Sequence, residues 1–332
     1  MSLVITLVTT MALLPAACSN DDATHRQTFP ALGTLITVEI HDPDPRRAER
    51  ATRAVAAYLE HIGREWYAWG DGELGQVNAA LKRGESAPVT PDLAAAIARA
   101  FEIRDRSAGY FDPAVGLLVE AWGFHTANRP PVTPPTESWL KRWRAEAPAR
   151  ARARIDAQIV SAPVPIKLGL GGLAKGTALA ASISLLAEQG IANALVDAGG
   201  DVQVMGRKGD RDWRIGIRDP RGPGILGAVA LKSGEAILSS GDYERFFELD
   251  GKRFHHLLDP HTGLPVSHTA GVTVIHRDAE LADAAATALM AAGPEHFLTL
   301  AAQLDVHLAL LVTSAGEMLT TRDMQARLEE PR

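Results

Sequence analysis

The chain has 332 residues, 46% hydrophobic and 22% charged, a balance typical of a globular protein and unlike that of a disordered or fibrous one. Its 34 Lys and Arg against 40 Asp and Glu give a net charge of −6, which excludes an overall positive field for holding nucleic acid. A single cysteine, Cys18, excludes a disulfide framework and a zinc site built from cysteines.

The first 17 residues are uncharged and end in small residues directly before Cys18. This run is shorter than the roughly 20 residues that cross a bilayer as a helix, and it is typical of a secretory signal. The preceding Leu14-Pro15-Ala16-Ala17 resembles a bacterial lipobox, with proline where leucine is usual. We expect a signal peptide over 1–18, a polar tether over 19–28, and lipid anchorage at Cys18 on the periplasmic side of the cell envelope. A merely apolar N-terminus is the alternative.

The next segments show strand and then helix patterns. Alternating apolar residues over 36–40 predict a half-buried strand, and helical spacing predicts a helix over 46–62. Thr90-Pro91 is a helix start, with the apolar stripe continuing to Phe101. Residues 126–154 are rich in Pro and Thr and then basic, so we expect a linker or an excursion there.

After this segment the chain becomes rich in predicted strands. Short apolar runs lie at 193–197, 202–205, 213–217, 243–249 and 252–258. Asp250-Gly251 predicts a tight hairpin between the last two runs. Helices at 279–291 and 294–303 and a hairpin around Gly316 close the chain. Because strands and helices mix without regular βαβ alternation, we predict an α+β fold with a mainly antiparallel sheet.

A glycine-rich segment, GLGGLAKG at 169–176, follows an apolar strand and opens a helix predicted to run to Leu186. Glycines let a backbone approach a ligand, a helix N-terminus favours anions, and Lys175 adds a positive charge. The same letters satisfy G-x-G-x-x-A, a dinucleotide-binding fingerprint in which Asp197 would be the acidic residue. The antiparallel strands that follow disfavour this Rossmann interpretation. A turn required only for tight packing is the other alternative.

Two further patterns carry oxygen and nitrogen chemistry. Asp283 and Thr287 are four residues apart in a predicted helix, so their oxygens project from one face and, with a backbone carbonyl, suit Mg²⁺. Capping or bonding within the helix is the alternative, and the commoner one for such a pair taken alone. His256 lies at a predicted strand end, where an imidazole could transfer a proton at the rim of a cleft. Surface decoration is the alternative. Partners that could support these residues are Asp201, Glu235 and Asp242.

Trp122 and Phe124 flank Gly123 in a chain with only 5% aromatic residues. The pair could hold a flat aromatic ligand by stacking. Packing in the core is the alternative.

Taken in order, these motifs resemble those of the ApbE family, the FAD:protein FMN transferases, from about Phe29 to Val312. The segments that carry the resemblance are ALGT (31–34), DPAVGLLVEAWGF (112–124), LGGLAKG (170–176), LVDAGGDVQVMG (195–206), SSGDYERFF (239–247), HHLLDPHTGLPV (255–266) and ADAAATAL (282–289). The resemblance implies one ApbE-like domain over 29–325, with a mainly antiparallel sheet and packed helices in two interleaved subdomains.

The implied activity is Mg²⁺-dependent transfer of FMN from FAD, through a phosphodiester, to a threonine of an exported flavoprotein, with release of AMP. The implied acceptors are respiratory-complex subunits or similar proteins with a Ser/Thr-Gly-Ala-Ser/Thr target. By resemblance Asp283, Thr287 and the carbonyl of Gly172 hold the metal, and His256 transfers the proton. The implied FAD-binding residues are Leu32, Ala68, Trp122, Gly123, Phe124, Gly169, Lys175 and Leu257.

Three positions depart from the family pattern. Gly169 stands where many relatives have Asp, Leu32 replaces a Met, and Ala68 aligns with a family tyrosine. We therefore expect Tyr67 or Trp69 to cover the FAD ring. The alternatives are a Mg²⁺-dependent FAD pyrophosphatase that uses water as acceptor, a non-catalytic FAD-binding envelope lipoprotein, and, on the fingerprint alone, an NAD-linked oxidoreductase.

Overall fold

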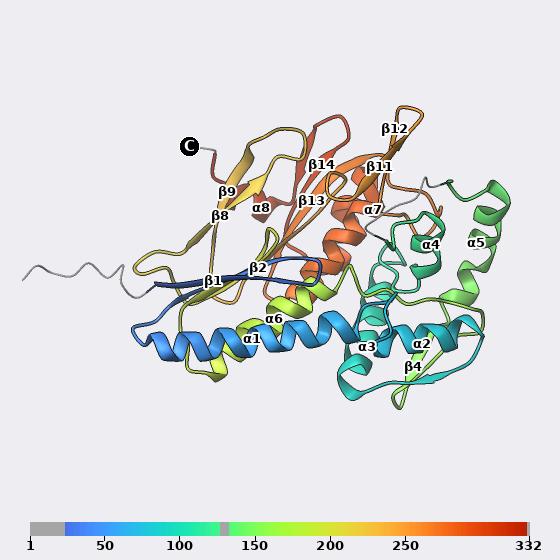
Figure 1. The fold of residues 1–332 in the computed structure, drawn as a ribbon. Helices are drawn as coiled ribbons and strands as arrows, with labels where there is room; N and C mark the ends of the chain where they lie inside the picture. Colours follow the sequence, from blue (N-terminus) through green and yellow to red (C-terminus); the bar gives the residue numbers. More distant parts are fainter. Residues whose placement is uncertain (1–23, 127–132, 331–332) are drawn as a thin grey trace, which may run out of the picture.

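An eight-stranded sheet forms the centre of the computed structural model, which describes residues 24–126 and 133–330 (Figure 1). Its strands, in spatial order, are β1 (Thr24–Ala31), β2 (Thr34–His41), β6 (Ala194–Ala198), β7 (Asp201–Met205), β10 (Ala236–Gly241), β13 (Thr269–His276), β14 (Leu308–Thr313) and β15 (Met318–Thr320). Every neighbouring pair is antiparallel. The predicted α+β fold with a mainly antiparallel sheet is confirmed.

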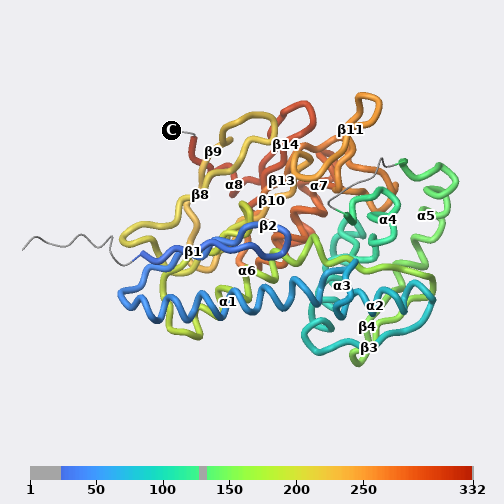
Figure 2. Tube along the Cα trace, viewed as in Figure 1, coloured from blue at the N-terminus to red at the C-terminus, as the bar shows by residue number. Residues whose placement is uncertain are grey.

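Three helices cover one face of this sheet (Figures 1 and 2). They are α1 (Pro45–Glu65), α6 (Ala174–Glu188) and α7 (Ala279–Gln303). Asp44 caps α1 by accepting from two backbone N–H groups, and the buried stripe of Val55, Leu59 and Ile62 faces the core. In α7 the chain leaves helical geometry at Gly293, whose φ of 73° favours glycine.

A hairpin of β8 (Trp213–Arg218) and β9 (Ile225–Leu231) covers the opposite face of the sheet. Trp213 is fully buried there, among Val204, Ile237 and Leu310 of the sheet. Helix α8 (Arg322–Arg327) adds its buried Met324 to the same cluster. Strands β7, β10, β13 and β14 are therefore covered on both faces, which fixes the strands that carry polar site residues.

A second region, on the right in Figures 1 and 2, is mainly helical. It contains α2 (Glu73–Lys82), β3 (Ala87–Pro88), α3 (Pro91–Arg106), α4 (Gly116–Ala121), α5 (Glu137–Arg150), β4 (Arg154–Asp156) and β5 (Ile159–Ser161). The hairpin of β11 (Phe246–Leu249) and β12 (Lys252–His255) packs on it through the ring pairs Trp122–Phe254 and Phe124–Phe247, both with centroids 5.5 Å apart. The helical region is inserted between α1 and α6 of the sheet region, as expected for interleaved subdomains.

Several local predictions are confirmed: the strand over 36–40, the helix over 46–62, the hairpins at Asp250-Gly251 and Gly316, and the break between the last two long helices. Two are wrong. The expected linker contains helix α5, and the expected tether is structured from Thr24, where β1 pairs with β2 along its whole length. The predicted signal peptide and residues 19–23 lie outside the described residues. Within the described ranges, no helix is long and apolar enough to span a membrane.

Candidate active site

The glycine-rich segment ends where α6 meets α7. A Cβ on Gly176 would lie 2.3 Å from the backbone oxygen of Ala279, and one on Gly172 would lie 3.0 Å from Oγ1 of Thr287. No side chain fits at the first distance, so glycine at 176 lets the two helices touch. The glycines therefore do allow tight packing, which was one alternative for this segment. This packing places the glycine turn against α7, the helix that carries Asp283 and Thr287.

Alanine at position 176 is expected to lower the free energy of unfolding by about 3 kcal/mol, because a methyl group must separate two helix backbones. Urea unfolding at equilibrium measures this change. The matched control is Gly171→Ala, since a Cβ at Gly171 meets no atom within 4 Å. A Gly176→Ala protein as stable as the Gly171→Ala protein would contradict the required contact.

The three residues predicted to hold a metal, Asp283, Thr287 and Gly172, lie together at this junction. Asp283 is buried, and its Oδ2 accepts from the backbone N–H of Gly176 at 2.9 Å. Thr287 is half-buried, adjoins Gly172, and its Oγ1 lies 3.4 Å from Oγ of Ser240 on β10. Burial raises the pKa of Asp283 to about 7, with Lys175 opposing and Asp201 adding to the shift. Because burial disfavours the ionised form of this carboxyl, a cation bound beside it would stabilise the carboxylate.

Lys175, in the first turn of α6, forms an ion pair with Asp201 of β7. Burial would lower the pKa of Lys175, but the carboxylates of Asp201, Asp283 and Glu244 outweigh burial and raise it. Asp201 is held in turn by the backbone N–H of Ser239 at 2.7 Å. The site therefore keeps one permanent cation at a helix N-terminus, where anions bind readily.

The donor set fits Mg²⁺ better than a softer metal. Among the described residues, no group of three or more His, Cys, Asp or Glu side chains is arranged to hold a metal ion. A divalent ion here would use the carboxylate of Asp283, the hydroxyl of Thr287 and the carbonyl of Gly172. These are hard oxygen donors, and Mg²⁺ is commonly held by one or two carboxylates together with substrate phosphates.

His256 follows β12 directly, as predicted. It is half-buried, and its Nδ1 lies 3.3 Å from the carbonyl oxygen of Arg245. Burial lowers the pKa of His256 to about 3, and the positive charge of Arg245 adds to that shift. The imidazole is therefore neutral near pH 7, with a lone pair on one ring nitrogen. Its neighbour His255 is buried and bonded to the carbonyl of Val266 at 2.5 Å, which is a structural role.

Some predicted FAD contacts require correction. The side chains of Trp122 and Phe124 are 2% and 1% exposed, and Nε1 of Trp122 donates to the carbonyl of Gly263 at 2.8 Å. Ala68 is 4% exposed. These side chains belong to the core, so the packing alternative is right for Trp122 and Phe124, and only backbone atoms remain for a ligand. Gly123, with φ of 70°, turns the chain between the two aromatics.

Trp69, not Ala68, lies beside the position where the family acid is missing. A Cβ on Gly169 would be 3.9 Å from Cη2 of Trp69. The indole is held by Nε1 donating to Glu120 at 3.1 Å and by Lys167, 5.2 Å from the ring centroid. Of the two aromatics proposed from the sequence, Trp69 is therefore the one adjacent to the glycine turn. Leu32, at the β1–β2 turn, and Leu257, just after β12, are half-buried, and their lining role stays a prediction.

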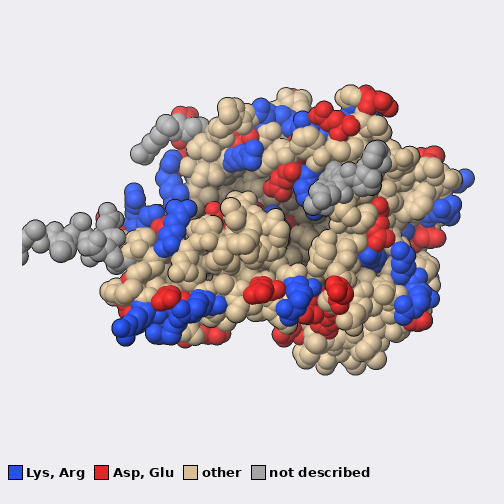
Figure 3. Space-filling model, in the orientation of Figure 1, with Lys and Arg blue, Asp and Glu red and all other residues tan. Residues whose placement is uncertain are grey.

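The face of the molecule in Figure 3 is hollowed near its centre, between charged and uncharged side chains. Comparison with known protein families identifies the family whose model matches this chain. The model of the ApbE family matches residues 32–312. The chain belongs to the ApbE family.

Named relatives agree with this family assignment. A protein of Rhodobacter capsulatus named FAD:protein FMN transferase is 42% identical over 304 residues, which are 91% of this chain and 58% of that protein. A Klebsiella pneumoniae protein of the same name is 31% identical over 278 residues, 80% of this chain and 77% of its own length. This chain thus spans little more than half the length of the Rhodobacter relative.

Solved structures agree as well. The ApbE protein of Thermotoga maritima superposes with a TM-score of 0.84 at 29% identity, covering 92% of this chain and all of that one. The flavinyl transferase ApbE of Pseudomonas stutzeri, in its apo form, gives a TM-score of 0.80 at 29% identity, covering 93% and 98%. The fold of this ApbE-family chain is therefore that of these proteins.

Three residues near the site of this ApbE-family chain were not predicted from its sequence, namely Asn78, Glu120 and Glu244. Asn78 is buried and joins two segments, since its amide donates to the carbonyls of Ala68 and Leu168 and accepts from the N–H of Leu168 at 2.7 Å. An Asn within a helical apolar stripe is the signal that could have found it. Glu120 and Glu244 carry no local pattern, because their partners lie far away in the sequence.

The other candidates have structural roles. Glu235 pairs with Arg327, and Asp242 pairs with Arg221, both at 2.8 Å. Asp197 caps the β6–β7 turn by accepting from Gly200. Because β6 and β7 are antiparallel, the Rossmann interpretation is wrong.

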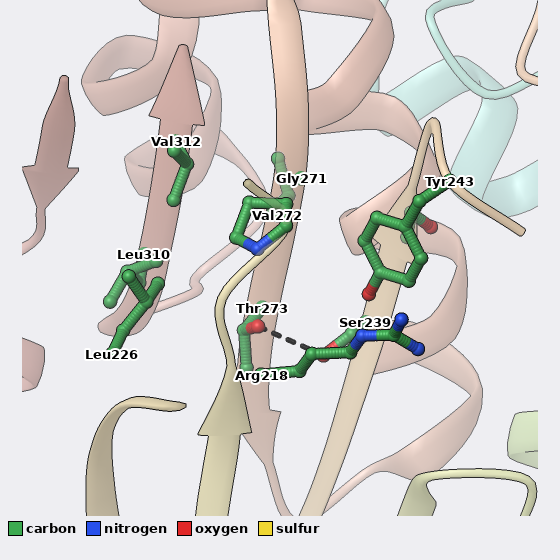
Figure 4. A pocket seen from close by; sticks show the side chains of 11 residues that line it. Arg218, Leu226, Ser239, Tyr243, Gly271, Val272, Thr273, Leu310 and Val312 are labelled. Atoms are coloured by element: carbon green, nitrogen blue, oxygen red, sulfur yellow. Dashed lines mark hydrogen bonds between the residues drawn. The ribbon is translucent and has the colours of Figure 1, made fainter. Parts of the chain in front are cut away.

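A small pocket lies under the β8–β9 hairpin, on the opposite face of β10 from the glycine turn (Figure 4). Ser239 and Thr273 share a hydrogen bond of 2.8 Å on its wall, and Arg218 lies over the ring of Tyr243, 4.4 Å from its centroid. The hydrogen bond of Ser239 holds one face of β10 in place, and Ser240, the next residue, contacts Thr287 on the other face. The pocket is thus part of the support of the site.

Proposed function

We propose that the chain is a FAD:protein FMN transferase, which moves FMN from FAD to a threonine hydroxyl of an exported flavoprotein and releases AMP. The observation that carries this proposal is the convergence of Asp283, Thr287 and Gly172 beside Lys175 at the N-terminus of α6. Such a junction suits a pyrophosphate with its cation. The names of the relatives support the same activity.

The residues supply the parts that this chemistry needs. The threonine oxygen forms a bond to the phosphorus of the FMN half of FAD, while the bond from that phosphorus to the bridging oxygen breaks and AMP leaves. The hydroxyl proton moves to the neutral imidazole of His256. Lys175 and the backbone N–H groups of the first turn of α6 hold the negative oxygens of the pyrophosphate, and Trp69 packs against a ring of FAD.

Asp283, Thr287 and the carbonyl of Gly172 would hold Mg²⁺. When bound, the ion neutralises charge on the pyrophosphate oxygens and stabilises the AMP phosphate as it leaves.

The deciding experiment mixes the purified protein with FAD, Mg²⁺ and an acceptor protein with a Ser/Thr-Gly-Ala-Ser/Thr segment, and measures the intact mass of the acceptor. A gain equal to one FMN phosphodiester supports the transferase. Release of free FMN and AMP with no change in acceptor mass would identify a pyrophosphatase instead. If FAD stays intact, the chain would be a protein that binds FAD without reacting with it.

We also propose that the chain acts on the periplasmic side of the envelope and is anchored through Cys18. The uncharged apolar run before the cysteine and the resemblance to a lipobox support this location. Mass spectrometry of the N-terminal peptide from cells tests it. A lipid-modified Cys18 is expected, and an unmodified Met1 would overturn the proposal.

A further inference from the structure

Arg245 lies in the segment that joins β10 to β11, and it contacts both His256 and the chain that follows α4. We infer that Arg245 is the positioning residue for His256: its carbonyl selects the imidazole tautomer, and its guanidinium holds that carbonyl in place. The inference rests on the proposed function only for the role of His256 as proton acceptor.

The carbonyl oxygen of Arg245 contacts His256 twice. It accepts from the backbone N–H of His256 at 3.0 Å and lies 3.3 Å from Nδ1 of the ring. A carbonyl oxygen can only accept, so a neutral imidazole must carry its proton on Nδ1 to make the second bond. Nε2 is then the ring nitrogen with a free lone pair. A base that takes a proton from a hydroxyl needs this tautomer.

The guanidinium of Arg245 connects this carbonyl to the helical region. Its Nη2 donates to the carbonyl of Phe124 at 2.5 Å, between residues 121 positions apart in the sequence. The Phe124 ring lies 6.5 Å from the imidazole and 5.5 Å from the Phe247 ring, so the histidine adjoins the same contact. Residues 242–245 form turns and bends between β10 and β11. The bond to Phe124 therefore restrains the one segment whose carbonyl selects the tautomer.

The charge of Arg245 acts in the same direction. A guanidinium beside a half-buried imidazole disfavours a positive charge on the ring, so the resting imidazole is neutral and carries a single N–H, whose hydrogen bond the carbonyl of Arg245 can accept. Metal-bound histidines are oriented in a similar manner by carbonyls that accept from the second ring nitrogen.

The variants that test this inference are Arg245→Met, which removes donor and charge at similar volume, and Arg245→Lys, which keeps the charge and one donor. The matched control is Arg253→Met, on the same hairpin, where the guanidinium lies over the exposed Phe246 ring, 4.0 Å from its centroid. Three quantities are measured: the Kd for FAD, the kcat of transfer, and the tautomer of His256 from ¹⁵N chemical shifts of its ring, assigned with the His256→Asn protein.

We expect the wild-type protein to have the proton on Nδ1 of His256. Arg245→Met should give a mixture of tautomers and a kcat about tenfold lower, a change of about 1.4 kcal/mol. The Kd for FAD should stay within about twofold, because the lost bond to Phe124 orients the base and does not hold FAD. Arg245→Lys should restore most of the rate, and Arg253→Met should match the wild type in all three quantities.

Three results would overturn the inference. One is a wild-type imidazole protonated on Nε2. Another is an unchanged tautomer in Arg245→Met. The third is a tenfold weaker Kd for FAD in that variant, which would assign Arg245 to phosphate binding. The tautomer is measured without acceptor, so it decides the positioning role even if the wild-type protein proves to transfer no FMN.

Discussion

Replacing Asp283 by asparagine is expected to lower FMN transfer by about three orders of magnitude, while FAD still binds. A Lewis-acidic ion supplies several kcal/mol to the transition state, and each 1.4 kcal/mol is a factor of ten in rate. The amide oxygen of asparagine can still accept from the N–H of Gly176, so the fold is retained. FAD affinity should change little, because the ring contact proposed for Trp69 does not involve position 283.

The measurement is the initial rate of acceptor flavinylation across a range of Mg²⁺ concentrations, with FAD binding followed separately by flavin fluorescence. Glu295→Gln is the control, since it changes an exposed carboxylate on the same helix α7. A wild-type rate in the Asp283→Asn protein at saturating Mg²⁺ would remove the metal site from the mechanism.

Replacing His256 by asparagine is expected to slow transfer by about 10²–10⁴-fold, the usual contribution of a general base, with no loss of FAD affinity. The pKa near 3 keeps the wild-type imidazole neutral, so its titration should leave no break in the rate between about pH 5 and 8. Single-turnover kinetics with saturating FAD separate this effect from binding.

His307→Asn is the control for this variant, because the His307 side chain is 69% exposed on the far β14 side of the sheet. If rate and FAD affinity fell together in His256→Asn, the histidine would be a binding residue, and proton transfer would need another acceptor.

Local spacing was sufficient to predict that Asp283 and Thr287 share one helix face and that the glycines form a turn before a helix. Asp283 and Thr287 share a face because they are four residues apart in one helix, and the glycines of the segment 169–176 predict a turn. That the turn meets this face depends on the packing of α6 on α7, for which the family resemblance was needed. The ion pair of Lys175 with Asp201 likewise joins elements that no window of sequence contains.

The errors have physical causes. Thr24–Thr28 was read as a tether because its residues are polar, yet an edge strand needs only one partner and can leave its outer side exposed. Residues 126–154 are predicted as a linker or an excursion because they are rich in Pro and Thr and then basic, and helix α5 within them buries only Leu140, Trp143 and Arg150. For Trp122 and Phe124, composition could not tell a ligand clasp from a core, since the ring partners on β11 and β12 are more than a hundred residues away.

The contact between Gly176 and Ala279 also sets an order of events during synthesis of the chain. The turn at 169–176 is synthesised about a hundred residues before helix α7. A truncated product that lacks α7 would therefore have the N-terminus of α6 but would lack Asp283 and Thr287, the residues proposed to hold a divalent ion. The junction that the proposed function requires is thus completed in a single late step, when α7 packs on α6.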